Sequence, residues 1–312
     1  MNNLFKNLLC EKYRPVILND VILSEDNRRF FEELNKKQEI PNLLLFGEPG
    51  TGKTTAAKII VNDILKCQYH YINASDKNGI DIIRNEITNF AQTKSFNGKQ
   101  KVIVLDEFEA TSFDAQRCLR NVMEEYASTT RFILTTNYLN KVIPAIQSRC
   151  QAIEIIPPFK EYIKRCLEII KKEDIRVNDD NKDKIVPFLK SCYPDLRKAI
   201  NNIQKFTINN ELNILDIKDN TIFAKKIYDH IQEKKNLFEL RKYIIEHEID
   251  FGNDYYLLLK DLFDVVFDDD KIMVENKRDL LLIIYDFMYK YNFVMDKEIN
   301  LFSCILEMSK HL

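Results

Sequence analysis

The stretch Gly47–Thr54 carries the clearest chemical pattern in the sequence. It reads Gly-Glu-Pro-Gly-Thr-Gly-Lys-Thr and fits Gly-x-x-x-x-Gly-Lys-Thr, with an apolar run before it and a helical pattern after it. Glycines let the backbone fold so that its N–H groups point at phosphate oxygens, and a helix beginning near Gly52 adds the positive end of its dipole. In such a loop Lys53 neutralises the β- and γ-phosphates, and the Thr54 hydroxyl binds Mg²⁺. The sequence therefore predicts a site for a nucleoside triphosphate with magnesium.

A pair of adjacent carboxylates is the second group that could do chemistry. The apolar run Val102–Leu105 is followed at once by Asp106 and Glu107. Ligands of open α/β sheets bind at the carboxyl ends of the strands. We expect Asp106 to hold Mg²⁺, directly or through water, and Glu107 to polarise the attacking water as general base. Glu107 favours hydrolysis over phosphoryl transfer to a small molecule, although it does not exclude the latter.

An amide follows another apolar run, Phe132–Thr135. Asn137 stands two residues beyond this run, where it could orient the attacking water or sense the γ-phosphate. An asparagine after a strand is more often a simple turn residue, so its position alone does not assign that role.

Alternating strands and helices must position these groups, and the first half of the chain shows that alternation. Short apolar or β-branched runs alternate with helical patterns, of which Thr54–Leu65 and Ser112–Tyr126 are examples. Alternation of this kind favours a parallel sheet with helices on both faces. The expected strands are Leu43–Phe46, Tyr69–Ile72, Val102–Leu105, Phe132–Thr135 and Ile153–Ile156.

The second half of the chain is predicted to be helical. Pro157 and Pro158 end the last expected strand, because proline cannot donate a hydrogen bond to a neighbouring strand. Helical patterns follow, with Pro187 and Pro194 as breaks, and the stretch 208–222 has weak periodicity and is the best candidate linker. The expected domains are residues 1–157 with the sheet, 158–222 as a small helical domain and 223–312 as an all-α domain.

Composition excludes several classes of protein. The net charge is −2, so no overall field attracts nucleic acid. The seven cysteines are widely spaced without a Cys-x-x-Cys pair, which favours reduced thiols in a cytosolic compartment, and the four histidines show no zinc-site spacing. No apolar run approaches the ~20 residues that cross a bilayer. We expect a cytoplasmic protein with no membrane partner.

Several motifs together give the chain a family resemblance. In order and spacing they resemble the AAA+ sliding-clamp loader ATPase subunits across essentially the whole chain, and the triplet Ser-Arg-Cys is the most specific of them. Phe108 and Glu109 depart from the Asp-Glu-Ala-Asp that small subunits of cellular replication factor C usually carry, and they resemble the large subunit of the T-even-type phage clamp loader. The motifs are Glu11–Pro15, Gly47–Thr54, Leu105–Glu107, Thr136-Asn137, Ser148–Cys150 and Pro194–Arg197.

The resemblance implies an architecture and roles for single residues. An AAA+ P-loop domain with a parallel sheet would be followed by a helical lid and an all-α collar. Asn137 would be sensor 1, Arg197 would be sensor 2, and Arg149 would be the arginine finger that reaches the γ-phosphate held by a neighbouring subunit. Such a finger can add ~10³-fold or more in rate and makes hydrolysis conditional on assembly. Tyr13 and Ile22 would contact adenine and ribose. Glu11 and Lys12 would contribute mainly backbone groups. Further nucleotide contacts are expected from Arg14, Gly50, Thr51, Gly52, Lys53, Thr54 and Thr55.

DNA contact is also implied by the resemblance. The candidates are Lys77 and Arg84; the alternative for each is an ordinary solvated cation. Several subunits would multiply these few charges along the DNA, which reconciles DNA binding with the net charge of −2. Gln116 is a candidate for coupling DNA contact to the acidic pair, whereas a glutamine on a helix face is most often only solvated.

The resemblance implies a clamp loader in which ATP binding opens the clamp and DNA triggers hydrolysis. Expected partners are copies of the chain, a second clamp-loader subunit, the ring-shaped sliding clamp and primer–template DNA, in the host cytoplasm if the chain is phage-encoded. Two alternatives stay open: an ATP-dependent scaffold that does not hydrolyse, and an AAA+ DNA translocase such as a branch-migration motor. Lys53 and Glu107 disfavour the first, and the Ser148–Cys150 triplet disfavours the second.

Overall fold

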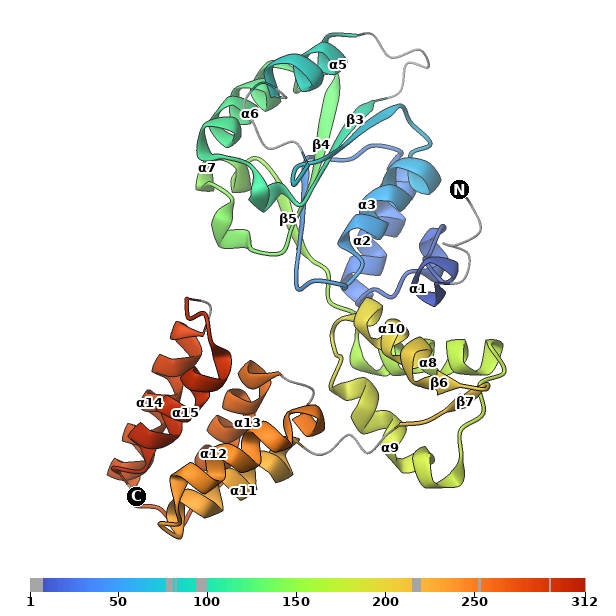
Figure 1. The fold of residues 1–312 in the computed structure, drawn as a ribbon. Coiled ribbons are helices and arrows are strands. Elements are labelled where there is room, and N and C mark those ends of the chain that lie inside the picture. The colour runs from blue at the N-terminus through green and yellow to red at the C-terminus, as the bar shows by residue number, and fades with distance from the viewer. Residues whose placement is uncertain are drawn as a thin grey trace. The chain divides into compact units, whose positions relative to one another are not determined.

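The computed structural model describes residues 8–76, 81, 83–93, 100–214, 220–251, 254–291 and 293–311. The chain divides into two compact units, Met1–Asn213 and Ile214–Leu312 (Figure 1). The first unit contains the sheet and the candidate catalytic residues. The described residues of the second unit form helices and their connections only.

A parallel sheet of five strands forms the centre of the first unit, in the order β2-β3-β4-β1-β5. The predicted fold class is confirmed. The last strand begins and ends two residues before its expected place, because Gln151 and Ala152 are exposed on an edge strand and lack the apolar pattern of a buried one. The strands are β1 Leu43–Phe46, β2 Tyr69–Asn73, β3 Lys101–Asp106, β4 Thr130–Thr136 and β5 Gln151–Glu154.

Helices cover both faces of this sheet, and the strands supply side chains to both cores. Leu43 and Leu45 belong to the core beneath α2 and α3, whereas Leu44 belongs to the core beneath α6 and α7. This alternation follows from the two-residue period of a strand. Figure 1 shows α2 and α3 on one side of the sheet and α5, α6 and α7 on the other. These helices are α2 Glu25–Lys37, α3 Lys53–Ile59, α5 Thr88–Gln92, α6 Phe113–Glu125 and α7 Pro144–Gln147.

Shorter helical segments complete this part of the chain. The helix predicted over Thr54–Leu65 is α3, which continues into a π-helical segment, η3 Ile60–Ile64. The remaining segments are α1 Leu9–Lys12, η2 Leu18–Asp20, η4 Ile83–Ile87, η5 Phe108–Ala110 and η6 Leu139–Lys141.

Helices α8, α9 and α10 follow the sheet, and one expectation here was wrong while another holds in part. Pro187 does not break a helix but lies inside α9 on an exposed face, where water can reach the carbonyl group that loses its partner. The predicted linker contains the division between the two units, after Asn213, but its first part is a β-hairpin. The turn residues of this hairpin, Asn209 and Asn210, have φ of 52° and 61°. Asparagine tolerates this left-handed conformation, and strands of two residues are too short to show periodicity. The bounds are α8 Phe159–Lys172, α9 Asp179–Lys190, α10 Leu196–Phe206, β6 Thr207–Ile208 and β7 Glu211–Leu212.

The second unit has a single described hydrophobic core, to which α11 through α15 all contribute. Leu258, Leu262 and Val266 of α13 are fully buried at helical spacing. None of the helices in the described parts of the chain combines the length and apolar character needed to span a bilayer. The elements are α11 Asn220–Gln232, α12 Leu237–Glu246, η7 Glu248–Phe251, α13 Tyr255–Asp268, α14 Val274–Lys290 and α15 Lys297–Met308.

Candidate nucleotide-binding site

The glycine-rich loop joins β1 to α3, as its sequence requires. Gly52 has φ of +100° and stands at the position before the first residue of α3, Lys53. Gly50 has φ of +72°, and a Cβ atom there would lie 1.7 Å from Oδ1 of Asp195. An L-residue at position 50 would therefore be strained and would collide with the carboxylate that precedes α10.

Lys53 is folded back into this loop. Its side chain is buried, and Nζ donates hydrogen bonds to the carbonyl oxygens of Gly47 at 2.9 Å and Glu48 at 2.7 Å. Burial lowers the pKa of Lys53 to about 8, although the carboxylates of Glu109 and Asp106 act in the opposite direction. The ammonium group thus lies in a site that penalises its charge until an anion is present.

The Asp106 carboxylate accepts hydrogen bonds from the hydroxyl groups of three residues, each on a different element. Thr54 Oγ1 donates to Oδ1 at 2.8 Å, Thr135 Oγ1 donates to the same oxygen, and the Tyr71 hydroxyl donates to Oδ2 at 2.6 Å. The structure therefore places Thr54 beside Asp106, as expected of two residues that share one metal ion. Burial and the hydrogen bond to Asp106 raise the pKa of Tyr71 well above its ordinary value.

Thr54 and Asp106 are suited to bind Mg²⁺ together with substrate phosphates, and they do not form a metal site made of protein ligands alone. Among the described residues there is no group of three or more His, Cys, Asp or Glu side chains that could hold an ion. Mg²⁺ usually keeps several waters and takes one or two protein ligands beside substrate phosphates. A threonine hydroxyl and a buried carboxylate next to the phosphate loop match that requirement.

Glu107 has an unusual backbone conformation for its residue type. Its φ and ψ are 54° and 44°, in the left-handed region, and its N–H donates to Thr135 Oγ1 at 3.1 Å. Such non-glycine conformations are costly and cluster at functional sites. The exposed Glu107 side chain lines the same pocket as Lys53 and Thr54.

Glu109 holds Asn137 in this pocket. Oε1 of Glu109 accepts hydrogen bonds from the Asn137 backbone N–H at 3.0 Å and from its side-chain Nδ2 at 2.7 Å. The other oxygen, Oε2, is buried and has no hydrogen-bond partner in the described part of the chain. The sequence marked Glu109 only as a departure from a family pattern, whereas the structure shows it orienting the expected sensor residue.

A second pocket adjoins the glycine-rich loop and is lined in part by residues near the N-terminus. Tyr13, Arg14 and Ile22 line it, and Arg197 lines both pockets. Glu11 and Lys12 are not among its lining residues: the Glu11 side chain pairs with Arg14, and that of Lys12 pairs with Glu173 at 2.6 Å. Other residues from the phosphate loop and α3 that line this pocket are Gly50, Thr51, Gly52 and Thr55.

Sequence reasoning missed several residues of these pockets. Leu196 and Ile200 of α10 and Arg165 of α8 line the second pocket, and Tyr71 and Thr135 contact Asp106. The first three look like ordinary residues of amphipathic helices. For the last two a signal existed, because each lies near the carboxyl end of a strand beside β3.

Two family models match this part of the chain. The ATPase family associated with various cellular activities (AAA) matches residues 43–158, and the sliding-clamp-loader large subunit, AAA+ ATPase lid domain, matches residues 156–215. The chain is also 39 % identical to the replication factor C small subunit of Picrophilus torridus over 240 residues, which cover 75 % of this chain and 73 % of that protein. The chain belongs to the replication factor C small-subunit family.

Other members of the replication factor C family match over a shorter stretch. The small subunit of Sulfolobus acidocaldarius is 41 % identical over 203 residues, or 63 % of this chain, and subunit 4 of Saccharomyces cerevisiae is 37 % identical over 201 residues, or 62 % of this chain. The chain spans 62 % and 61 % of these two relatives, which is less than two thirds of their length. A solved structure of RuvB from Thermotoga maritima shares the fold alone, with 18 % identity, a TM-score of 0.51 and coverage of 92 % of this chain and 90 % of that one.

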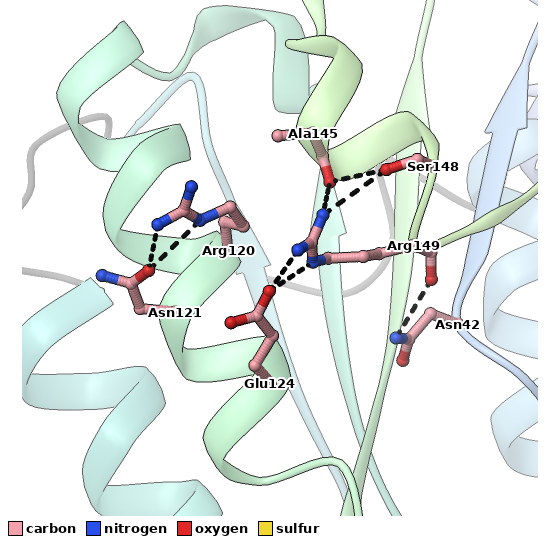
Figure 2. A network of polar contacts seen from close by, with 7 residues as sticks. All are labelled: Asn42, Arg120, Asn121, Glu124, Ala145, Ser148 and Arg149. Carbon is pink, nitrogen blue, oxygen red and sulfur yellow. Dashed lines mark hydrogen bonds and ion pairs between the residues drawn. The ribbon is translucent and has the colours of Figure 1, made fainter.

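Arg149, the residue that the family resemblance makes an arginine finger, lies outside both pockets of its own chain. It follows α7 and forms an ion pair with Glu124 of α6 (Figure 2). Among the described residues its guanidinium contacts Glu124, Ala145 and Ser148, none of which lines either pocket.

Gln116 is not a solvated residue on a helix face. Its side chain is buried, with Oε1 accepting from the Ile143 N–H at 2.9 Å and Nε2 donating to the Lys141 carbonyl at 3.0 Å. Its hydrogen bonds therefore connect α6 to the segment that leads into α7.

The expected DNA contacts fall in a part of the chain with gaps. Lys77 lies outside the described residues, and Arg84 lies in η4 with a side chain that is outside the described part. Both assignments stay predictions.

The lowered pKa of Lys53 leads to a prediction about pH. Without nucleotide, Lys53 loses its proton as the pH rises through about 8, whereas a lysine held by phosphates keeps it. ATP binding above this pH should therefore take up a proton, and ATP affinity should fall by up to about tenfold between about pH 7 and pH 9. Calorimetry in two buffers of different ionisation enthalpy measures that uptake. Equal apparent enthalpies at about pH 8.5 would contradict the prediction.

Proposed function

We propose that the protein is an ATPase subunit of a sliding-clamp loader. ATP binding opens the ring-shaped clamp and loads it onto primer–template DNA, and DNA-triggered hydrolysis then releases it. The observation that carries this proposal is that residues 156–215 match a clamp-loader lid, and that α10 of this lid supplies Arg197 to the P-loop pocket. A DNA-replication role fits the replication factor C relatives.

Each residue of the pocket has a separate role in ATP hydrolysis. Lys53 neutralises phosphate charge, Glu107 accepts the proton of the attacking water, and Asn137 orients that water or senses the γ-phosphate. Thr54 and Asp106 would hold Mg²⁺, which supplies further neutralisation of the phosphates.

An assembly is supported by Arg149, which lies outside both pockets of its own chain. It reaches the nucleotide of a neighbouring subunit, so the partners are copies of the chain, a second clamp-loader subunit, the clamp and primed DNA. Residues 1–157 form the ATPase domain, 158–222 the lid and 223–312 an oligomerisation collar, a role supported by the helical core of that last region. Tyr13, Arg14 and Ile22 hold the adenosine part of ATP.

A closer relation to the large subunit of the T-even-type phage loader is part of the proposal. The lid model is named for a clamp-loader large subunit, and Phe108 and Glu109 fit that branch. A phage-encoded loader works in the cytoplasm of its host.

Reconstitution tests the function. The purified protein, combined with its second subunit, the clamp and primed circular DNA, should retain clamps on the DNA only with ATP, and clamp plus DNA should raise its ATPase rate. Strand displacement without any clamp would instead show an AAA+ translocase. Absence of hydrolysis in a single-turnover assay would show an ATP-dependent scaffold. The mass of the ATP-bound complex gives the number of subunits.

A further inference from the structure

Arg149 is held at both its backbone and its side chain in the isolated subunit. Its carbonyl oxygen accepts a hydrogen bond from Asn42 Nδ2 at 3.3 Å, and Asn42 in turn accepts from the Phe132 N–H of β4 at 3.0 Å. Its guanidinium group reaches α6, where Glu124 lies (Figure 2). The backbone of Arg149 is thus tied to the sheet and its side chain to a helix.

The guanidinium contacts leave part of the group available. Nε donates to Glu124 Oε1 at 2.8 Å, and Nη2 donates to the same oxygen. Nη1 donates to the Ala145 carbonyl at 2.7 Å and makes a long contact of 3.4 Å with Ser148 Oγ. A guanidinium has five N–H groups in a rigid plane. The second N–H of Nη2 therefore has no acceptor in the described part of the chain, and the 3.4 Å contact is easily exchanged for a stronger acceptor.

Neighbouring charges leave this arrangement undisturbed. Arg120 lies one helical turn before Glu124, but its guanidinium donates to Asn121 Oδ1 at 2.7 Å and 3.2 Å. The Arg149 side chain is 34 % exposed and that of Glu124 is 53 % exposed, so a phosphate on another subunit can approach the unpaired N–H of Nη2 and the weakly bonded N–H of Nη1. An arginine that already has this orientation loses little conformational freedom when it meets a phosphate.

We propose that Glu124 is the positioning residue of the arginine finger. Its carboxylate accepts hydrogen bonds from Nε and Nη2 of Arg149 and so orients the remaining N–H groups toward the γ-phosphate of the neighbouring subunit. Glu124 itself does not contact the nucleotide. The inference rests on the proposed function, because it needs a neighbouring subunit that binds ATP.

Three variants test this role in the assembled loader with clamp and primed DNA. Glu124→Ala should lower kcat about tenfold with an unchanged KM for ATP, because a misplaced catalytic group costs rate. Glu124→Gln keeps an oxygen acceptor and should recover most of the lost rate. Glu125→Gln removes the same charge from the next residue of α6, which is exposed, and should match the unaltered protein. The melting temperature of each subunit should stay close to that of the unaltered protein, since exposed ion pairs contribute little to stability.

A double-variant cycle separates positioning from a general structural effect. In an Arg149→Ala background, adding Glu124→Ala should cause no further loss, because Glu124 acts only through Arg149. A further tenfold loss, or a Glu124→Ala rate equal to or above that of the unaltered protein, would overturn the proposal. If Arg149→Ala itself keeps full activity, the trans-acting finger of the proposed function fails. If Arg149→Ala is impaired and Glu124→Ala is not, only the positioning role fails.

Discussion

Glu107→Gln should lower DNA-stimulated ATP hydrolysis by about 10²- to 10⁴-fold, the range associated with loss of a general base. Glutamine has nearly the same size and can keep the backbone N–H bond to Thr135, but its amide cannot take a proton from water. ATP affinity should stay within about twofold, since no attraction to phosphate is removed. Single-turnover hydrolysis and equilibrium binding of a fluorescent ATP analogue measure the two quantities separately.

The comparison variant for this prediction is Lys53→Ala. It removes the buried ammonium of the phosphate loop and should abolish ATP binding, so the two variants should separate binding from chemistry. Unchanged hydrolysis by Glu107→Gln would mean that another carboxylate is the base. Glu109 would then be the next candidate, because it lines the same pocket and has a buried oxygen without a hydrogen bond in the described part of the chain.

Arg149→Ala should reduce the ATPase rate of the assembled loader by about 10³-fold, as expected for loss of an arginine finger. The same variant as an isolated chain should bind ATP with unchanged affinity, because Arg149 lines neither pocket. Arg29→Ala is a matched control, since Arg29 is exposed on α2 and pairs with the exposed Glu25 at 3.5 Å. Steady-state ATPase assays with clamp and primed DNA give the rates.

Mixed assemblies decide whether this arginine acts on a neighbouring subunit. A chain with Arg149→Ala has an intact pocket, and a chain with Glu107→Gln has an intact finger. Mixing the two should restore part of the activity that each lacks alone, because some sites then combine the intact pocket with the intact finger. No recovery in assemblies of normal mass would show that Arg149 does not act in trans.

The positions of many candidate site residues were predictable because their motifs are local. The glycine-rich loop is contiguous in sequence, and its neighbours, an apolar strand and a helix, confirm where it folds. Asp106 is the last residue of a strand that is buried throughout, and Glu107 follows it directly. Parallel strands bring their carboxyl ends to one edge, so Asp106 was expected near the loop, and the Thr54–Asp106 contact agrees with that.

Prediction failed where an element is short or a residue has an ordinary type. The hairpin of β6 and β7 has strands of two residues, and Pro187 resembles a helix break although it lies inside α9. Glu11 and Lys12 belong to a recognised motif, and the ion pairs of their side chains with Arg14 and Glu173 were not indicated by that motif. Side-chain direction within a short helix depends on what packs against it.

The sequence by itself indicated a nucleotide-binding ATPase, in agreement with the match to the AAA family, and it predicted the residues of the phosphate loop and the acidic pair. These features depend on spacing along a few consecutive residues, and backbone geometry translates that spacing directly into position. Only the tertiary structure decided the partners of those residues: Glu109 for Asn137, Tyr71 for Asp106 and Glu124 for Arg149. Each of these contacts joins segments that are distant in the chain, and the packing of helices on a sheet, which no local pattern records, brings them together.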